Sequence, residues 1–296
     1  MKGTSNVCIY ASVLLVVSML RTEEVTAQQK GLPPSFLSRF SETLRSTGTT
    51  ERERIETDRH DFTQSTKTVG RGVFQIEGGY SFLCRSEGGE TEHSHTAPEM
   101  MLRLGITERM EFRIRYNDVW RFSDTEDLSG SEDLRWSFKF RTTNQQGWIP
   151  ESALEVRFTA PTGAPDWSTE QVNFGLDYIY GWRLSKFVEL YGSTGFATNG
   201  LAEFAFLPED PANEDFMLYT QSIAIGAELT EKVTAYGEFF GLFTDGFEYD
   251  DQSPVYFNIG VDYYFSNNCV VDVRVGNGLN HDADDFFCGV GGGWRF

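Results

Sequence analysis

Residues 110–117, MEFRIRYN, alternate strictly between apolar and polar side chains. A period of two is the period of a β-strand, whose successive side chains point to opposite faces of a sheet. Met110, Phe112 and Ile114 would share one face, while Arg113 and Arg115 would share the other. The stretch therefore predicts a strand with one apolar face and one charged face.

The same alternation continues over most of the chain from residue 73. We predict twelve strands, at about 73–84, 96–106, 110–120, 132–142, 151–160, 172–183, 187–197, 217–229, 232–243, 255–265, 269–276 and 286–296. Most are longer than the roughly 5–6 residues usual in soluble domains. All but one of them reach or exceed the roughly 9–11 residues that a tilted membrane strand needs. The predicted fold is all-β: a single transmembrane up-and-down antiparallel β-barrel, residues 73–296.

The connections between these strands also alternate, between short and long. Short turns such as 184–187 and 229–233 are followed by long, mostly acidic links at 85–95, 121–131, 161–171, 198–216, 244–254 and 277–285. Outer-membrane barrels have short periplasmic turns and long outer loops. A soluble sandwich would share the period of two. Aromatic residues near the strand ends, such as Trp136 and Trp182, favour the barrel because bilayer interfaces are rich in Trp and Tyr.

The first 27 residues are expected to be a secretory signal peptide. Lys2 precedes an apolar run, Val7 to Leu20, and Val25-Thr26-Ala27 provides small residues for cleavage before Gln28. The mature protein is then expected in the bacterial outer membrane. Residues 28–72 lack a strand period and are predicted to be a flexible periplasmic arm or a plug in the lumen. As a plug, the segment would bring Arg52, Arg54 and Arg59 to acidic groups of the barrel.

Charged side chains on the inward face form two groups. Strands at 110–160 carry what we call the basic wall: Arg113, Arg115, Arg135, Lys139, Arg141 and Arg157. Strands at 172–276 carry what we call the acidic wall: Asp177, Glu189, Glu228, Glu238, Asp262 and Asp272. Two interpretations stay open. The walls could set a transverse field that selects solutes, or the charges could pair locally across neighbouring strands.

The two ends of the barrel sequence carry further signals. Trp294 and Phe296 end the chain, and a terminal Phe after an alternating strand resembles the strand that the barrel-assembly machinery reads. Cys84 and Cys288 lie on the predicted first and last strands, which meet if the barrel closes. A disulfide across this seam is one hypothesis; two free thiols are the alternative.

Enzymatic and nucleic-acid functions are not indicated. Lys plus Arg total 25 against 44 for Asp plus Glu, a net charge of −19, which argues against a nucleic-acid partner. No hydrolase, zinc-protease or nucleotide-binding motif is present. The four histidines fall outside the predicted strands, and His93-Ser94-His95 is expected to be a solvated loop. We therefore expect no catalytic residues, no metal and no cofactor.

Several motifs together resemble one family of bacterial outer-membrane transporters, which is named for the meta-pathway of phenol degradation. The similar segments are 57–63 (TDRHDFT), 72–80 (GVFQIEGGY), 98–109 (PEMMLRLGITER), 161–163 (PTG), and 274–287 with its RVG, GLN and ADDFF elements. His60 stands where the family usually has Pro. The resemblance implies a Gram-negative outer-membrane β-barrel that acts as a channel or transporter, in some members for aromatic or other hydrophobic compounds.

Two functions are therefore expected from the sequence. The first is an outer-membrane channel for passive passage of small solutes, with selectivity from the wall charges and inward Tyr191, Tyr236 and Tyr264. The alternative is a plugged structural or surface-interaction barrel that acts through its acidic outer loops. Its expected partners are outer-membrane lipid, the barrel-assembly machinery and, for a channel, a small-molecule solute.

The transverse-field interpretation makes a testable prediction. Reversing the charges of Arg113 and Arg115 should shift the ion selectivity of the reconstituted protein towards cations, because the basic wall would lose its sign. Reversal potentials in a salt gradient measure this shift. An unchanged reversal potential would contradict the field interpretation.

Overall fold

The structure is a computed structural model that describes residues 53–59, 62–87, 90–124, 127–199, 216–246 and 251–296. All of these residues belong to one compact unit, Thr47–Phe296. Three parts of the sequence discussed above lie outside the described residues. They are the expected signal peptide (1–27), residues 28–52 with Arg52, and His60. No helix among the described residues has the length and apolar character needed to cross a membrane.

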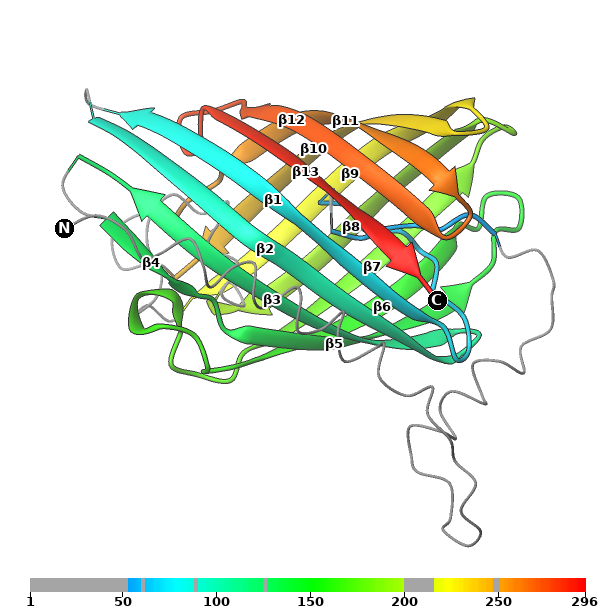
Figure 1. Ribbon diagram of the computed structural model, residues 1–296, viewed down its shortest axis with the longest axis horizontal. Coiled ribbons are helices and arrows are strands. Elements are labelled where there is room, and N and C mark those ends of the chain that lie inside the picture. Colours follow the sequence, from blue (N-terminus) through cyan, green and yellow to red (C-terminus); the bar gives the residue numbers. More distant parts are fainter. Residues whose placement is uncertain (1–52, 60–61, 88–89, 125–126, 200–215, 247–250) are drawn as a thin grey trace, which may run out of the picture. The chain divides into compact units, whose positions relative to one another are not determined.

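The regular secondary structure of the described chain is almost entirely β-strand (Figure 1). They are β1 (Phe74–Glu87), β2 (Glu90–Thr107), β3 (Met110–Phe122), β4 (Asp127–Ser131), β5 (Leu134–Thr143), β6 (Glu151–Ala160), β7 (Phe174–Arg183), β8 (Val188–Thr198), β9 (Met217–Thr230), β10 (Val233–Asp245), β11 (Val255–Ser266), β12 (Cys269–Gly278) and β13 (Phe286–Arg295). A short 3₁₀ helix, η1 (Pro165–Trp167), lies between β6 and β7.

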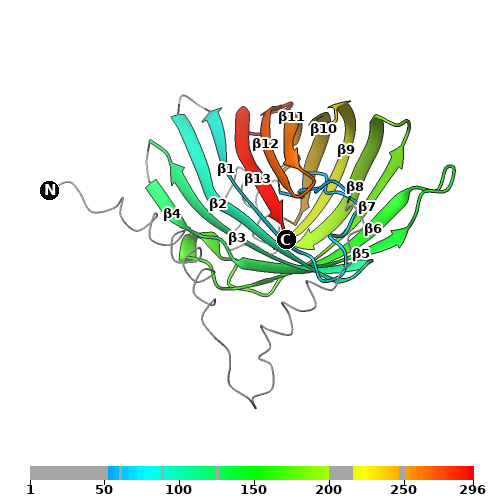
Figure 2. The same ribbon diagram turned by 45° about the vertical axis from the view of Figure 1, so that its right-hand side comes forward.

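Twelve of these strands form a closed antiparallel barrel, which confirms the predicted fold. Each pairs with its sequence neighbours, β3 passing directly to β5, and β1 closes the sheet by pairing with β13 over ten residue pairs. Figure 2 shows the ring of strands. In the part of the chain that the structure describes, closure leaves none of the twelve barrel strands at an open sheet edge, and only the short β4 at the rim ends the sheet. A lipid environment requires such closure because it offers backbone groups no hydrogen bonds.

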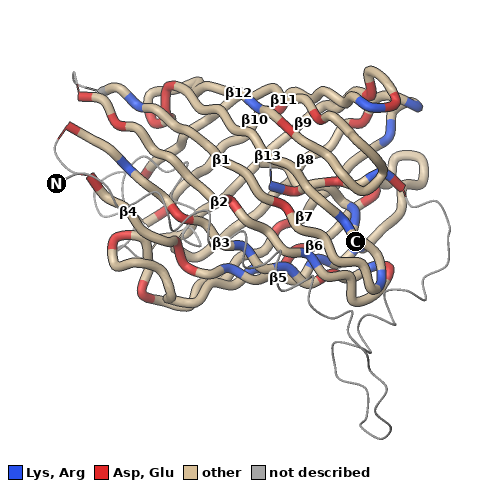
Figure 3. Tube along the Cα trace, in the orientation of Figure 1, with Lys and Arg blue, Asp and Glu red and all other residues tan. Residues whose placement is uncertain are grey.

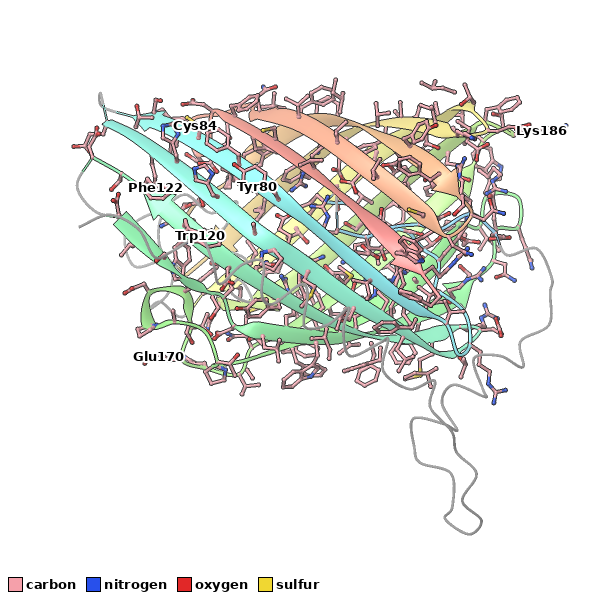
Figure 4. The ribbon with its side chains drawn as sticks, in the orientation of Figure 1. Tyr80, Cys84, Trp120, Phe122, Glu170 and Lys186 are labelled. Carbon is pink, nitrogen blue, oxygen red and sulfur yellow. The ribbon has the colours of Figure 1, made fainter. Side chains whose placement is uncertain are left out.

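The barrel is polar inside and apolar outside. Buried polar side chains such as Gln75, Glu238 and Asn258 point into the lumen, whereas Ile223, Phe239 and Val273 are about half exposed on the outer face. Figure 4 shows the side chains that line the outside of the ribbon, many of them carbon-rich. This distribution reverses that of a soluble domain and is the one expected for a wall in lipid. The inward charges therefore require partners within the lumen.

The long-loop rim is more ordered than its sequence suggests. Strand β4 pairs with the end of β3, Asp118–Phe122, where β3 extends past β5. Trp167 of η1 is buried against Val119 beside β4. Asp133 accepts hydrogen bonds from the backbone amides of Thr162 and Gly163, so this carboxylate holds the PTG segment. Figure 4 places Glu170 at this rim and Lys186 at the opposite, short-turn rim.

Two sequence expectations at this rim are wrong. The sequence predicts a loop at 85–95, but β1 extends to Glu87 and β2 begins at Glu90. The alternation is lost there because strands beyond the lipid meet water on both faces. His93 and His95 consequently lie on β2, where the His95 ring contacts Phe82 and its Nδ1 lies 2.8 Å from the Tyr80 hydroxyl.

Gly105 of β2 lies where the chain enters the first strand, and the space there admits only a hydrogen atom. The Gly105 amide donates to the Val73 carbonyl, and the Gly72 amide donates to the Gly105 carbonyl. A Cβ at position 105 would lie 1.6 Å from the carbonyl oxygen of Gly70. Because the obstacle is backbone, a side chain can be accommodated only if the chain before β1 moves.

Gly105→Ala is accordingly expected to destabilise the barrel by about 1–3 kcal/mol, the usual cost of overpacking. The measurement is the temperature at which the folded band shifts to unfolded mobility on a heat-modifiability gel. Gly237→Ala is the matched control, because a Cβ at Gly237 would meet no atom closer than 3.9 Å. Equal transition temperatures for the two variants would contradict the expectation.

Candidate functional site

The described residues 53–59 and 62–72, which we call the luminal segment, lie inside the barrel ahead of β1. The Ile55 amide donates to the Asn267 carbonyl in the β11–β12 turn, which fixes one end of the segment at the short-turn rim. The other end returns to the same rim, where Gly72 bonds Gly105. Figure 2 shows the segment within the ring of strands. The segment thus enters the lumen and returns as a loop.

Asp58 is the central anchor of the luminal segment. Asp58 is 1% exposed, and its carboxylate contacts three cations of the barrel strands: Lys139 Nζ at 2.9 Å, Arg103 Nη2 at 3.3 Å, and Arg113. Burial alone would raise the pKa of Asp58, but attraction to Arg103, Lys139 and Arg113 holds that pKa well below its usual range. The carboxylate is therefore ionised and occupies the middle of the basic wall.

Carboxylates from the wall surround the same anchor. Glu77 of β1 accepts the Asp58 amide at 2.8 Å and pairs with Arg103 Nη1 at 3.0 Å. Glu111 of β3 pairs with Arg103 Nε at 2.9 Å and accepts the Val69 amide at 2.7 Å. Buried charges are tolerated when they are paired and hydrogen-bonded. The luminal segment is therefore part of a continuous charge network.

Arg59, the next residue, extends in the opposite direction to the acidic side. Its guanidinium binds Glu99 of β2 and, at 2.5 Å, Asp272 of β12. Glycines on the inner face of β1 and β13 make room for it. A Cβ at Gly79 would lie 2.5 Å from Arg59 Cζ, and one at Gly291 would lie 2.2 Å from Nη2. Small residues of the first and last strands thus form a recess for Arg59.

The innermost part of the segment contacts the acidic strand β10. Glu238 accepts the backbone amides of Phe62 and Thr63 at 3.1 and 2.6 Å. The Phe62 ring stacks on Phe240 with centroids 4.5 Å apart and an interplanar angle of 6°. Phe240 belongs to an apolar cluster inside the barrel that includes Tyr256 and Phe287. The segment therefore makes both polar and aromatic contacts with this wall.

Near the short-turn rim, Arg54 completes the contacts with the acidic side. Its Nη2 lies 2.9 Å from Glu228 Oε1, and its guanidinium stacks 4.0 Å from the Tyr264 ring centroid. Ile55 is fully buried beside Tyr264 and Val270. The two described arginines proposed from the sequence to meet acidic groups, Arg54 and Arg59, both contact carboxylates in the structure.

The structure places the remaining wall residues as follows. In the basic wall, Arg113 also pairs with Glu155 at 3.2 Å, Arg157 with Asp177 at 2.5 Å, and Arg141 with Glu151 at 3.4 Å. In the acidic wall, Glu189 pairs with Arg183 at the exposed rim, and Asp262 is buried. Tyr236 and Tyr264 are buried in the lumen, and Tyr191 is half-buried. Figure 3 shows how charges of both signs follow one another along the strands. The wall charges thus form ion pairs both with each other across neighbouring strands and with the luminal segment.

A cavity lies between the luminal segment and the long-loop rim. Its empty space is about 890 Å³, including the part open to solvent. The lining includes Arg59 and Phe62 of the luminal segment and, from seven strands and one loop, Glu99, Arg115, Glu132, Arg135, Arg157, Asp177, Ile179, Thr220 and Leu242. The cavity is therefore a charged chamber with the luminal segment at its base.

Of the two alternatives for Cys84 and Cys288, a disulfide or two free thiols, the structure has the free thiols. Cys84 and Cys288 lie on neighbouring strands, but both are free thiols. The register pairs Cys84 with Phe286 and Cys288 with Phe82, an offset of two residues. Diagonal neighbours in a sheet are about 7–8 Å apart, whereas the Cα atoms of a disulfide usually lie about 5.5–6 Å apart.

At the end of the chain, Trp294 and Phe296 are each more than half exposed on the outer face, and their rings stack 6.2 Å apart. The described residues contain no group of three or more His, Cys, Asp or Glu that could hold a metal ion.

The sequence reasoning missed Asp58, Glu77, Glu99 and Arg103 as luminal residues. A signal was present, because all four lie in segments 57–63, 72–80 and 98–109, whose motifs carried the family resemblance. In the structure these three segments meet at the anchor of the luminal segment. Motif residues with no evident role thus turn out to share one network.

The chain is similar to one protein family and to several solved structures. The family model described as "Putative MetA-pathway of phenol degradation" matches residues 57–296. No curated protein matches the chain. Among solved structures, the chain is similar to the NanC porin, with 6% identity, a TM-score of 0.47, and coverage of 75% of this chain and 100% of that one. It is also similar to the KdgM porin, with 10% identity, a TM-score of 0.45, and coverage of 75% and 99%. The translocator domain of autotransporter NalP from Neisseria meningitidis matches with 10% identity, a TM-score of 0.41, and coverage of 76% and 88%.

Asp58→Asn tests the anchor of the luminal segment. Loss of the carboxylate charge leaves Arg103, Arg113 and Lys139 short of a buried counter-charge, so docking of the segment should weaken by about 3–5 kcal/mol. Hydrogen–deuterium exchange of amides 53–72 should then become much faster. Because the pKa of Asp58 is lowered, the wild-type segment should keep its protection above about pH 4 and lose it as the pH falls further.

The matched control for this experiment is Asp166→Asn, which changes an exposed carboxylate in the β6–β7 loop. Amide protection of residues 53–72 should be the same in this control as in the wild type. If Asp58→Asn retains wild-type protection as well, the carboxylate does not anchor the segment.

Proposed function

The chain belongs to the family described above, and from this premise we propose that it forms a channel in the bacterial outer membrane whose lumen the luminal segment closes at rest. The solutes are small molecules, including aromatic or hydrophobic ones, and they pass by diffusion without an enzymatic step. The observation that carries the proposal is that the luminal segment is held mainly by ion pairs and hydrogen bonds, below a cavity lined by charged groups.

The kind of contact matters because it decides whether the segment can leave. An apolar core resists opening, since its surface must be rehydrated at about 25 cal/mol per Å². An ion pair such as Arg59–Asp272 contributes little net free energy once the desolvation of both partners is counted. When the segment moves, water can solvate both charges in the lumen. Docked and released states would then differ by only a few kcal/mol, which is the range in which a solute or a field can shift populations.

Secretion and insertion complete the proposal. Cleavage of residues 1–27 would release the mature chain to the periplasm, and the exposed Trp294 and Phe296 on the last strand would serve the barrel-assembly machinery. The short-turn rim, from which the luminal segment enters, would then face the periplasm. Outer-membrane lipid would cover the apolar outer face.

A second function is favoured by one observation. The luminal segment contacts both walls, through Asp58 on one side and Arg59 and the Phe62 and Thr63 amides on the other. If these contacts never open, the protein is a plugged structural barrel that acts through its acidic outer loops. Asp282 and Asp285 of these loops accept backbone amides of Ser253 and Ser86, so part of the acidic surface is already engaged in loop structure.

Single-channel recording in planar bilayers separates the two functions. The mature protein, residues 28–296, should be closed most of the time and open briefly. The double variant Asp58→Asn/Arg59→Gln removes the two central anchors, so its open probability should rise by about tenfold or more. Asp166→Asn is the matched control and should behave as the wild type.

Two outcomes would contradict the proposed channel. Stable insertion with no openings in any variant would favour the plugged structural barrel. Equal, steady openings in the wild type and the double variant would show that solutes bypass the luminal segment and that it is not a gate.

A further inference from the structure

One aromatic side chain of the luminal segment completes a stack of rings whose other members belong to the barrel wall. Phe240 of β10 stacks on Phe62, with centroids 4.5 Å apart and an interplanar angle of 6°, and on Tyr256 of β11, at 5.0 Å and 20°. Phe287 of β13 meets Phe240 and Tyr256 edge-on, at centroid distances of 6.1 and 5.9 Å. The strands of the closed sheet hold these three wall rings in place. Phe62, on the luminal segment, is therefore the member of this stack that can leave.

The contacts that keep Phe62 in this position come from strands β9 and β10. The Phe62 and Thr63 amides both donate to Glu238, and the Thr63 hydroxyl donates to Ser222 Oγ at 2.5 Å. Glu238 and Phe240 lie two residues apart on β10, so both side chains point into the lumen. One strand thus holds the backbone of the segment through polar contacts and its ring through an apolar contact.

These two kinds of contact respond differently when the segment leaves. Water replaces the polar contacts, because it can hydrogen-bond both the freed amides and the Glu238 carboxylate. Water does not replace the ring contact, since the face of Phe240 that Phe62 covers is apolar and its hydration is unfavourable. A molecule that covers this face instead of Phe62 lowers the free energy of the released state. It therefore shifts the population of the luminal segment from docked to released.

The position of the Phe62 ring can be reached from the cavity above the luminal segment. Phe62 itself lines that cavity, together with Leu242, which belongs to the same apolar cluster as Phe240. A solute that enters from the long-loop rim thus arrives at the stack before it passes the segment. Parallel stacking on Phe240 requires a flat π-system, which a saturated ring of the same size lacks.

We propose that the position of the Phe62 ring on Phe240 is a binding site for a planar aromatic solute, and that the protein occupies this site at rest with its own side chain. Solute and docked segment then exclude each other, and arrival of the solute releases the segment. The inference deepens the proposed function, because it gives the channel a gate that responds to its solute. It rests on that function only for its physiological meaning. Binding and displacement can both be measured without a membrane.

The test uses the mature full chain in detergent micelles at pH 7, with two uncharged amides as probes. Benzamide has a planar ring, whereas cyclohexanecarboxamide has a saturated ring of similar size. Benzamide at saturation should speed hydrogen–deuterium exchange of the Phe62 and Thr63 amides, because displacement of the Phe62 ring weakens their attachment to Glu238. Cyclohexanecarboxamide should leave this exchange unchanged.

Two variants should change the affinity for benzamide in opposite directions, which guards against misfolding as the explanation. Phe62→Ala removes the internal competitor, so isothermal titration should show binding about tenfold or more tighter than in the wild type. Phe240→Leu removes the ring on which the solute stacks and should abolish binding. Phe239→Leu is the matched control, because Phe239 is the next residue but is half exposed on the outer face; it should bind as the wild type does. Heat-modifiability checks the fold of every variant.

Four results would overturn the proposal. They are no benzamide binding by folded Phe62→Ala, equal affinity of Phe62→Ala and the wild type, equal binding of cyclohexanecarboxamide, and slower exchange of the Phe62 and Thr63 amides with benzamide. The last result would mean that the solute adds to the docked segment instead of replacing its ring. Absence of binding together with openings of the Asp58→Asn/Arg59→Gln variant would refute the site alone. Displacement of Phe62 without openings in any variant would refute the channel and leave the site.

Discussion

Every backbone amide and carbonyl that faces lipid must be paired within the protein, and this requirement closes the sheet between β1 and β13. The rest of the structure follows from closure. Since alternate side chains must point inward, a wall that is apolar outside collects its charges in the lumen. Those charges cannot be left uncompensated, so the lumen holds a network in which strands and the luminal segment supply counter-charges to one another. Closure, inside-out polarity and the luminal segment are thus consequences of one constraint.

The order of charges in the luminal segment matches the two walls of the barrel. Asp58 and Arg59 are adjacent in sequence, yet one binds cations of β2, β3 and β5 and the other binds carboxylates of β2 and β12. Adjacent side chains of an extended segment point in opposite directions, so a two-residue acid–base pair is the shortest element that can contact both sides. The transverse separation of charge is therefore largely neutralised at this level.

The barrel could be predicted from the sequence because the period of two is a local property, visible in residues 110–117 alone. Where the period is lost, prediction failed: β1 and β2 extend past the lipid, and β4 forms where β3 projects beyond β5. The strands that carry Cys84 and Cys288 were correctly placed as neighbours, but their two-residue offset depends on the closing register, which no local pattern contains. The partners of Asp58 were unpredictable for the same reason, since they come from residues 45 to 81 positions away in the chain.

Arg59 has a consequence for the order in which the molecule can be built. Its guanidinium joins Glu99 of β2 to Asp272 of β12, so it spans the seam where β1 meets β13, and it rests in the recess that Gly79 and Gly291 leave on either side of that seam. A side chain in this position is best placed while the two end strands are still apart. The luminal segment would then have to lie inside an open sheet before β13 pairs with β1. Arg59 could then contact Glu99 and Asp272 together only if the last hairpin, β12–β13, pairs with β1 in the correct register.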